Sequence, residues 1–177
     1  MMEKRLYKKL KSFQLKPFLN EEDLKKLALV SEICNYKKGE VIFKEGQRGD
    51  AIYILLNGRV RIYKTTDNRE LTLAVLTKGS LFGEMDVINP TKKGRTAGAK
   101  AETSCRLIRI PAQEIRKGIK TGDITIYRFI HLLSVILCSR LRTMDDAYSR
   151  LFIECKSEEA RDELRAFREK LLKEWKF

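Results

Sequence analysis

The chain has few of the residues that catalytic and metal sites usually require. It contains one histidine, His131, and four widely separated cysteines without a C-x-x-C pair. We therefore expect neither a disulfide framework nor a zinc site, and a metal-binding β-roll enzyme would need several histidines. A G-x-x-x-x-G-K-[ST] loop is also missing, as is a serine or cysteine beside a plausible base. These absences predict a protein that is not an enzyme and uses no metal or cofactor.

Long apolar runs are missing as well. The opening MMEKRLYKKLKSF is basic but has no apolar signal-peptide run, so we expect a cytoplasmic protein. The most apolar stretch, Ile124 to Cys138, falls short of the roughly 20 residues that a bilayer needs. It also carries Arg128 and His131. This stretch predicts a buried or interfacial helix and no membrane span.

Proline is scarce, with three in 177 residues, while 43% of the residues are hydrophobic. This composition predicts one mid-sized folded domain with a real core and excludes wholesale disorder. The formal net charge is +13, which indicates a polyanionic partner. The excess is concentrated in residues 1–16, at net +5, and residues 91–120, at net +7. An acidic partner protein at the basic N-terminal arm is therefore predicted.

Residues 1–31 are helical in character. Leu6, Leu10 and Phe13 recur at helical spacing, and Asn20 is followed by three acidic residues. An asparagine N-cap with acids in the first turn is a typical helix start. We predict two short helices packed on the rest of the chain.

Residues 32–112 change to short apolar or alternating segments separated by glycine, which is typical of strands. Asn57-Gly58, between two apolar runs, predicts a β-hairpin with a type I′ turn. Short strands at this spacing indicate an all-β sandwich or roll. The predicted strands are Val41 to Phe43, Ala51 to Leu56, Val60 to Tyr63, Leu71 to Leu76 and Cys105 to Ile110.

Residues 113–155 form a long helix region in which apolar residues keep spacings of three and four from position 126 to position 151. A helix of this length exceeds what one small β-domain covers, so we predict a homodimer through residues 123–152. The alternative is a helix that lies wholly on its own barrel. After Cys155, residues 157–177 predict a C-terminal amphipathic helix that begins at the cap Ser157.

Two short segments carry chemistry: Phe82-Gly83-Glu84-Met85 and Arg95-Thr96-Ala97. Gly83 allows a close backbone approach, and N–H groups at the start of a short helical turn form an anion site. Arg95 can clamp a phosphate, and a carboxylate such as Glu84 can accept a hydrogen bond from a sugar hydroxyl. Together these groups predict a pocket for an anionic ribose phosphate.

This pattern resembles the cyclic nucleotide-binding domain family, which includes the catabolite activator proteins, cyclic-nucleotide-dependent kinases and gated channels. The resemblance covers roughly residues 15–150 and is carried by an ordered set of motifs. They are Gly39-Glu40-Val41-Ile42-Phe43, Glu45-Gly46, Gly49-Asp50, Tyr53-Ile54, Gly58-Arg59-Val60, Gly79, Phe82-Gly83-Glu84-Met85 and Arg95-Thr96-Ala97.

The resemblance implies a mainly β fold with flanking helices. It is a double-stranded β-helix, that is, a jelly-roll-like β-roll, with N-terminal helices, a long C-terminal lid and dimerisation helix and one extra C-terminal helix. The phosphate-binding cassette would be residues 82–97. The ligand would be cAMP or cGMP, and the function that of a free-standing cyclic nucleotide sensor that signals through its C-terminal helices.

The resemblance also implies roles for particular residues. Glu84 would accept the ribose 2′-hydroxyl, and Arg95 would pair with the exocyclic oxygens of the cyclic phosphate. Backbone N–H groups of Gly83, Met85 and Ala97 would add hydrogen bonds. Thr96 matches a position that contacts guanine in cGMP-selective members, but it does not settle the base.

The family match also suggests four residues that line the base. Leu73 and Ala74 would lie on the strand beside it, and Met144 and Asp145 on the long helix at its level. For the first two the alternative is simple core, and for Asp145 an exposed helix acid. Asp145 could otherwise accept a hydrogen bond from an adenine amino group.

Several alternatives remain open at this stage. Glu84 and Arg95 could form a surface ion pair. Asp86 adds negative charge where many family members have a small neutral residue, and Lys92 and Lys93 either offset that charge or lie in a solvated loop.

Two other functions are also conceivable: a nucleic-acid-binding protein of the catabolite activator type, or a ligand-free oligomerisation scaffold. Only 26 residues follow Leu151, and they predict one helix. A helix-turn-helix domain needs several, so no DNA-binding domain is expected.

Overall fold

The computed structural model describes residues 2–11, 17–66, 69–155 and 157–174. The chain divides into two compact units, Met1–Leu133 and Ser134–Phe177. The first unit contains all of the strands of the described chain and the predicted cassette. The second contains the C-terminal part of a long helix and the helix that follows it.

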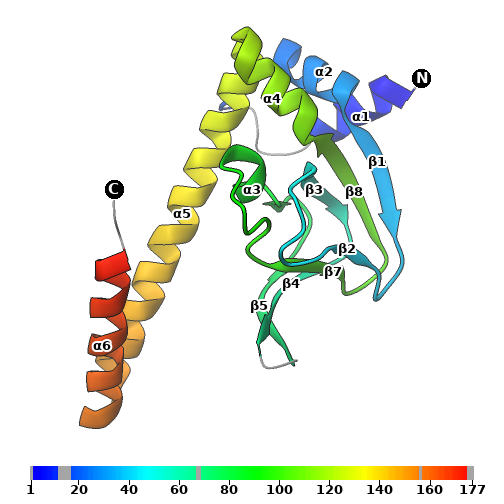
Figure 1. Ribbon diagram of the computed structural model, residues 1–177. Helices are drawn as coiled ribbons and strands as arrows, with labels where there is room; N and C mark the ends of the chain where they lie inside the picture. Colours follow the sequence, from blue (N-terminus) through cyan, green and yellow to red (C-terminus); the bar gives the residue numbers. More distant parts are fainter. Residues whose placement is uncertain (1, 12–16, 67–68, 156, 175–177) are drawn as a thin grey trace. The chain divides into compact units, whose positions relative to one another are not determined.

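The first unit is built on two antiparallel four-stranded sheets, in the orders β1-β8-β3-β6 and β2-β7-β4-β5 (Figure 1). The predicted mainly β fold with flanking helices is therefore confirmed, and all five predicted strands are present. The strands are β1 (Glu32–Tyr36), β2 (Val41–Phe43), β3 (Ala51–Asn57), β4 (Val60–Thr66), β5 (Arg69–Leu76), β6 (Leu81–Phe82), β7 (Gly98–Ala101) and β8 (Cys105–Pro111).

The hairpin predicted at Asn57-Gly58 is wrong. β3 pairs with β6 and β8, whereas β4 pairs with β5 and β7, so this turn connects the two sheets. Gly58 does have a positive φ of 93°, and a Cβ there would lie 2.5 Å from the carbonyl oxygen of Ser104. The glycine is needed for the turn and for this close approach, and neither need requires the flanking strands to pair.

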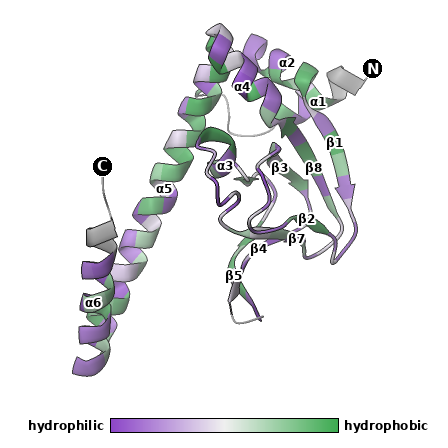
Figure 2. Ribbon diagram, viewed as in Figure 1, coloured by the Kyte–Doolittle hydropathy of each residue, from purple (hydrophilic) through white to green (hydrophobic). Residues whose placement is uncertain are grey.

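The core lies between the sheets and is rich in side chains from β3, β7 and β8. Figure 2 colours the ribbon by the hydropathy of each residue. Phe43, Tyr53 and Phe82 form an aromatic cluster with ring centroids 5.4–6.1 Å apart. Each ring buries enough apolar surface to contribute about 1.5–3 kcal/mol. The cluster matters for the site because it lies directly beneath Arg95.

Three helices gather at one end of the roll (Figure 1): α1 (Met2–Lys11), α2 (Glu21–Val30) and α4 (Ala112–Thr121). Leu6 and Leu10 are buried, as their helical spacing predicts, while Phe13 lies outside the described residues. Asn20 is the N-cap of α2 and makes a reciprocal capping box with Asp23. α4 was not predicted as a separate helix. It ends at Gly122, whose left-handed φ of 70° stops the helix.

The predicted long helix is α5 (Ile124–Glu154), and α6 (Glu158–Glu174) follows it. By length and composition alone α5 could cross a membrane. Its N-terminal part, however, buries Phe129, Leu132 and Leu133 in the first unit, as a core helix does. In the second unit, Tyr148 of α5 donates a hydrogen bond to the carbonyl oxygen of Leu164 in α6.

Candidate functional site

The two chemistry-bearing segments meet at the start of a short helix, α3 (Met85–Ile88), which follows β6. Glu84 is the N-cap residue of α3 and is 2% exposed. Gly83 precedes it with a φ of 80°, and its carbonyl oxygen accepts a hydrogen bond from the Arg95 guanidinium at 2.9 Å. A Cβ at Gly83 would lie 2.8 Å from that guanidinium. Glycine is therefore required here for both conformation and space.

Arg95 is 4% exposed and turned into the roll. Besides Gly83, its guanidinium donates to the carbonyl oxygen of Ala51 at 2.9 Å and to the carboxylate of Asp50 at 3.1 Å. Its central carbon lies 3.8 Å from the centroid of the Phe43 ring, a cation–π geometry. Arg95 is thus held on three sides by protein groups and is not a surface ion pair.

One donor of this arginine is unsatisfied. Among the described residues, the Nε atom of Arg95 is the buried side-chain nitrogen that has no hydrogen-bond partner. A buried donor on a charged group without an acceptor costs about 1–3 kcal/mol. Such an atom indicates a place where an acceptor on a ligand would be stabilising.

Asp50 connects Arg95 to the sheet behind it. Its carboxylate also accepts a hydrogen bond from Arg109 at 2.9 Å, and Arg109 in turn pairs with Glu32 on the neighbouring strand β1. Burial alone would raise the pKa of Asp50, but the bonds from Arg109 and Arg95 together outweigh burial and hold that pKa below its ordinary value. Asp50 is therefore a charged anchor for Arg95.

The other predicted cassette residues differ in their exposure. Phe82 is 2% exposed and belongs to the aromatic core, whereas Met85 is 53% exposed. Thr96 is exposed, with its hydroxyl 3.9 Å from the sulfur of Met85, and Ala97 is half-buried. The structure thus places Met85 and Thr96 side by side at the surface, next to the buried Glu84 and Arg95.

Leu73 and Ala74 lie on β5, the edge strand of the second sheet. Ala74 pairs with Ile62, which packs against the core, so it faces the interior side of the sheet. Leu73 is the extra residue where the register shifts opposite Ile62 and Tyr63, and it is 53% exposed. Neither residue is simple core, because both are exposed.

Met144 and Asp145 belong to the second unit. Met144 is 68% exposed, and Asp145 lines a groove of about 740 Å³ between α5 and α6 together with Tyr148 and Phe152. Their predicted contact with a base stays a prediction.

Of the residues that raised doubt, Lys92 and Lys93 are exposed, in keeping with a solvated loop. Asp86 is 5% exposed, and its carboxylate accepts backbone N–H groups of Gly49 at 2.5 Å and Thr91 at 3.1 Å. Sequence reasoning missed this role because Gly49 lies 37 residues earlier in the chain.

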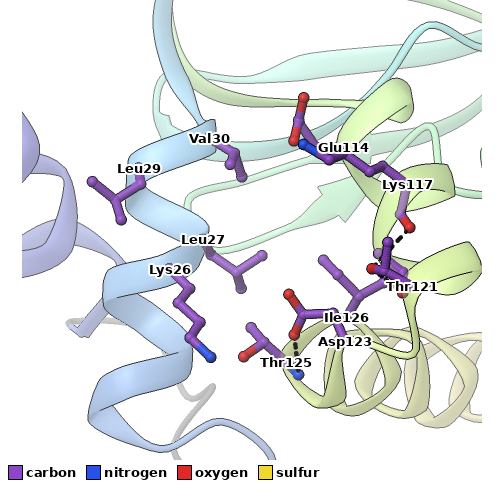
Figure 3. Close-up of a pocket in the computed structure, with 11 residues that line it drawn as sticks. Lys26, Leu27, Leu29, Val30, Glu114, Lys117, Thr121, Asp123, Thr125 and Ile126 are labelled. Atoms are coloured by element: carbon purple, nitrogen blue, oxygen red, sulfur yellow. Dashed lines mark hydrogen bonds between the residues drawn. The ribbon is translucent and has the colours of Figure 1, made fainter.

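A separate pocket of about 230 Å³, which sequence reasoning also missed, lies between α2, α4 and the start of α5 (Figure 3). Apolar side chains such as Leu27 and Ile126 line it, with Lys26 and Lys117 on its two sides. Gly118 permits the close helix approach beside this pocket, since a Cβ there would lie 2.2 Å from Ile126. Within the described ranges, no group of three or more His, Cys, Asp or Glu residues could hold a metal ion.

The fold and the site define a class: an antiparallel β-roll in which a buried arginine is hydrogen-bonded to the backbone just before a short helix. The family model described as "Cyclic nucleotide-binding domain" matches residues 33–121, half of the chain. The chain belongs to the cyclic nucleotide-binding domain family.

Individual relatives agree with this assignment. A curated "Cyclic AMP receptor protein" from Thermus thermophilus is 32% identical over 111 residues, which are 62% of this chain and 49% of the relative. A "cGMP-dependent protein kinase" from Plasmodium berghei is 40% identical over 76 residues, 43% of this chain and 8% of the kinase. The chain thus spans about half or less of the length of these curated relatives.

Solved structures show the same fold. A putative cyclic nucleotide-binding protein from Geobacter metallireducens superposes with a TM-score of 0.65 at 25% identity, covering 80% of this chain and 98% of that one. The catabolite activator protein of Thermus thermophilus gives a TM-score of 0.62 at 29% identity, covering 77% of this chain and 62% of that one.

Proposed function

We propose that this protein is a non-catalytic cytoplasmic sensor that binds a 3′,5′-cyclic nucleotide, cAMP or cGMP, through residues 82–97. The observation that carries the proposal is the buried Nε of Arg95, a charged donor without a partner in the described chain. A phosphate oxygen is the acceptor that best satisfies a guanidinium. Relatives named for cAMP and for cGMP both match this chain, so the base is left open.

The proposed binding geometry follows from the placement of the cassette. Arg95 contacts the exocyclic oxygens of the cyclic phosphate, and Glu84 at the start of α3 accepts the 2′-hydroxyl, the one free hydroxyl of the ring. Backbone N–H groups of Gly83, Met85 and Ala97 complete the anion site. Ala74, exposed on the interior side of β5, offers a surface for the base, and the exposed apolar side chain of Leu73 precedes it on the same strand.

Isothermal titration calorimetry of the full chain with cAMP and with cGMP tests the proposal. We expect saturable binding of at least one nucleotide and an affinity about a hundredfold lower in Arg95→Lys, because lysine lacks the planar fork. Glu84→Gln should weaken binding of the ribose. Arg59→Lys, at an exposed ion pair with Glu102, is the control and should bind normally. No heat with either nucleotide would contradict the proposed function.

We also propose that the sensor is a homodimer through residues 123–152. Support comes from apolar side chains of the second unit that stay exposed along α5: Leu141 at 47%, Met144 at 68% and Leu151 at 59%. A stripe at spacings of three and four on a helix is the usual seam for a second helix. The proposed dimer would bring two α5 helices together and give the nucleotide an element through which to signal.

Analytical ultracentrifugation of Leu141→Asp and Leu151→Asp tests the seam, and we expect the molecular mass to fall by half. Ser139→Asp, at an exposed position on the same helix, is the control. Leu133 is unsuitable for this test because it is fully buried in the first unit. An unchanged mass in both leucine variants would refute the dimer. The acidic partner of the basic N-terminal arm stays a prediction.

A further inference from the structure

Asp86 sits where a negative charge is least expected, in the first turn of α3 and two residues after Glu84. A buried carboxylate close to an anion site should lower the affinity for a phosphate unless it has another task. In this structure each of its two oxygens accepts a backbone N–H group. Carboxylate bonds of this kind are charge-assisted and about twice as strong as neutral ones.

One of the two N–H groups lies within the cassette and the other in a loop distant in sequence. Thr91 is five residues after Asp86, in the segment that leads to Arg95. Gly49 belongs to the loop between β2 and β3. The Asp86 carboxylate therefore connects α3 to the loop that contains Gly49 and to the segment that contains Thr91.

The loop held by Asp86 is the loop that holds Arg95. Asp50, directly after Gly49, accepts from the Arg95 guanidinium at 3.1 Å, and Arg116 of α4 donates to the carbonyl oxygen of Gly49 at 3.1 Å. Arg95 then returns to the start of the cassette through its bond to the Gly83 carbonyl. The hydrogen bonds therefore run in a closed circuit from Asp86 through Gly49 and Asp50 to Arg95, and back along the chain from Gly83 to Asp86. This circuit holds Glu84 and Arg95 in position relative to one another.

Gly49 and Asp86 also fit one another sterically. A Cβ at Gly49 would lie 2.8 Å from the Asp86 Oδ2 atom and 3.1 Å from the Asp86 Cβ. No carbon approaches an oxygen this closely without a shift. The hydrogen bond from Gly49 to Asp86 therefore requires a residue without a side chain at position 49.

We propose that Asp86 is a positioning residue that sets the cassette in its binding geometry before any ligand arrives. The proposal rests on the proposed function for its consequence in binding, and on the geometry of the free protein for the contact itself. A site that is already ordered loses less conformational entropy when it binds. Asp86 thus raises the affinity for an anion despite its own charge.

The test uses a double-mutant cycle of Asp86→Ala, Gly49→Ala and the combined variant in the full chain. Hydrogen exchange measured by NMR in the free protein should become faster at the amides of Gly49 and Thr91 in Asp86→Ala. Calorimetry with cAMP and cGMP should show about tenfold weaker binding in each single variant. Gly49→Ala should cost less in the Asp86→Ala background than in the wild type, because its closest contact, to the carboxylate oxygen, is gone and only the 3.1 Å contacts to the backbone carbon and Cβ of position 86 remain.

Two further variants make the readout specific. Asp86→Asn keeps one acceptor and should lie between the wild type and Asp86→Ala. Glu40→Ala removes an exposed carboxylate that also accepts a backbone N–H, from Lys37, and should leave nucleotide binding unchanged. Thermal unfolding of each variant checks that the fold is intact.

Each outcome decides the question. Unchanged exchange at Gly49 and Thr91 would overturn the proposal whether or not a nucleotide binds. Equal or tighter nucleotide binding by Asp86→Ala would overturn it too, since the carboxylate would then act only as an unfavourable charge. Faster exchange in Asp86→Ala, with no nucleotide binding by the wild type, would support the contact made by Asp86 and would refute only the proposed function.

Discussion

Asp23 joins α2 to the start of α5, and its removal gives a sharp test of how the first unit is held together. The carboxylate is 2% exposed. It accepts the backbone N–H of Asn20 at 2.9 Å, the hydroxyl of Thr125 at 2.8 Å and the guanidinium of Arg128 at 3.0 Å. One side chain thus completes a helix cap and anchors a second helix.

The cost of Asp23→Ala follows from these three contacts. Loss of the capping box costs about 1 kcal/mol. The Thr125 hydroxyl, 1% exposed, would remain buried without its acceptor at a further cost of about 1–2 kcal/mol. Arg128 is 43% exposed on its side chain, so its pairing adds only a few tenths. We expect the free energy of unfolding to fall by about 3 kcal/mol.

Urea unfolding followed by circular dichroism at pH 7 measures this loss. The control is Glu22→Ala in the same helical turn, whose side chain is 77% exposed and forms an ion pair with Lys26. It should cost no more than about 0.5 kcal/mol. If Asp23→Ala cost as little as this control, the assignment of Asp23 as an anchor between the helices would be refuted.

The same contact has a defined pH dependence. Burial alone would raise the pKa of Asp23, but hydrogen bonds from Asn20, Thr125 and Arg128 together outweigh it and hold the pKa below its ordinary value. A carboxyl with a lowered folded-state pKa stabilises the fold above its unfolded pKa of about 4. That contribution is lost as the pH falls through the folded-state pKa. The stability gap between the wild type and Asp23→Ala should therefore narrow from pH 5 downward, and a constant gap would contradict the assignment.

Two other predictions concern packing and ionisation. Gly118→Ala places a Cβ 2.2 Å from Ile126 and should lower the free energy of unfolding by about 1–2 kcal/mol despite its better helix propensity. Gln113→Ala, exposed on the same helix, is the control, and stabilisation by Gly118→Ala would argue against the close packing. Burial, with smaller contributions from Tyr53 and Cys34, raises the pKa of Tyr36 to about 12. The protonated Tyr36 side chain therefore stabilises the fold fully below pH 10, and this contribution is lost as the pH rises through 12. Burial also raises the pKa of Tyr53, so absorbance titration at alkaline pH should show late tyrosine ionisation that Tyr36→Phe reduces by one residue, and an unaltered curve would refute the burial argument.

Local sequence patterns predicted the strands and helices whose own residues have a clear apolar run or a cap. The apolar runs at Ala51 to Leu56 and Cys105 to Ile110 became central strands, and Asn20 capped the helix that its following acids indicated. These segments needed no knowledge of their neighbours. The family motifs likewise singled out Glu84 and Arg95, which the structure places close to the start of α3, while their role in binding stays a prediction.

The strands that the sequence did not predict, β6 and β7, depend on pairing with strands that are distant in sequence. β7, Gly98–Ala101, consists of residues with weak strand preference and exists because β2 and β4 flank it. β6 has two residues, too few for any periodicity. The contact between Asp86 and Gly49 spans 37 positions, so no local pattern could have revealed it. The sequence therefore predicted which residues form the cassette but not which groups hold those residues in place.

The positive charge around the cassette illustrates the same distinction. Residues 91–120 carry a formal excess of +7 from nine basic and two acidic residues. Four of those nine side chains are engaged within the first unit: Arg95 and Arg109 on Asp50, Lys100 on Glu70 and Arg116 on the Gly49 carbonyl. Charges paired with carboxylates contribute little to the field far from the surface. The formal charge therefore overstates the long-range attraction of this region for an anion, and we expect recognition of the proposed nucleotide to depend more on the geometry around Arg95 than on the net charge around it.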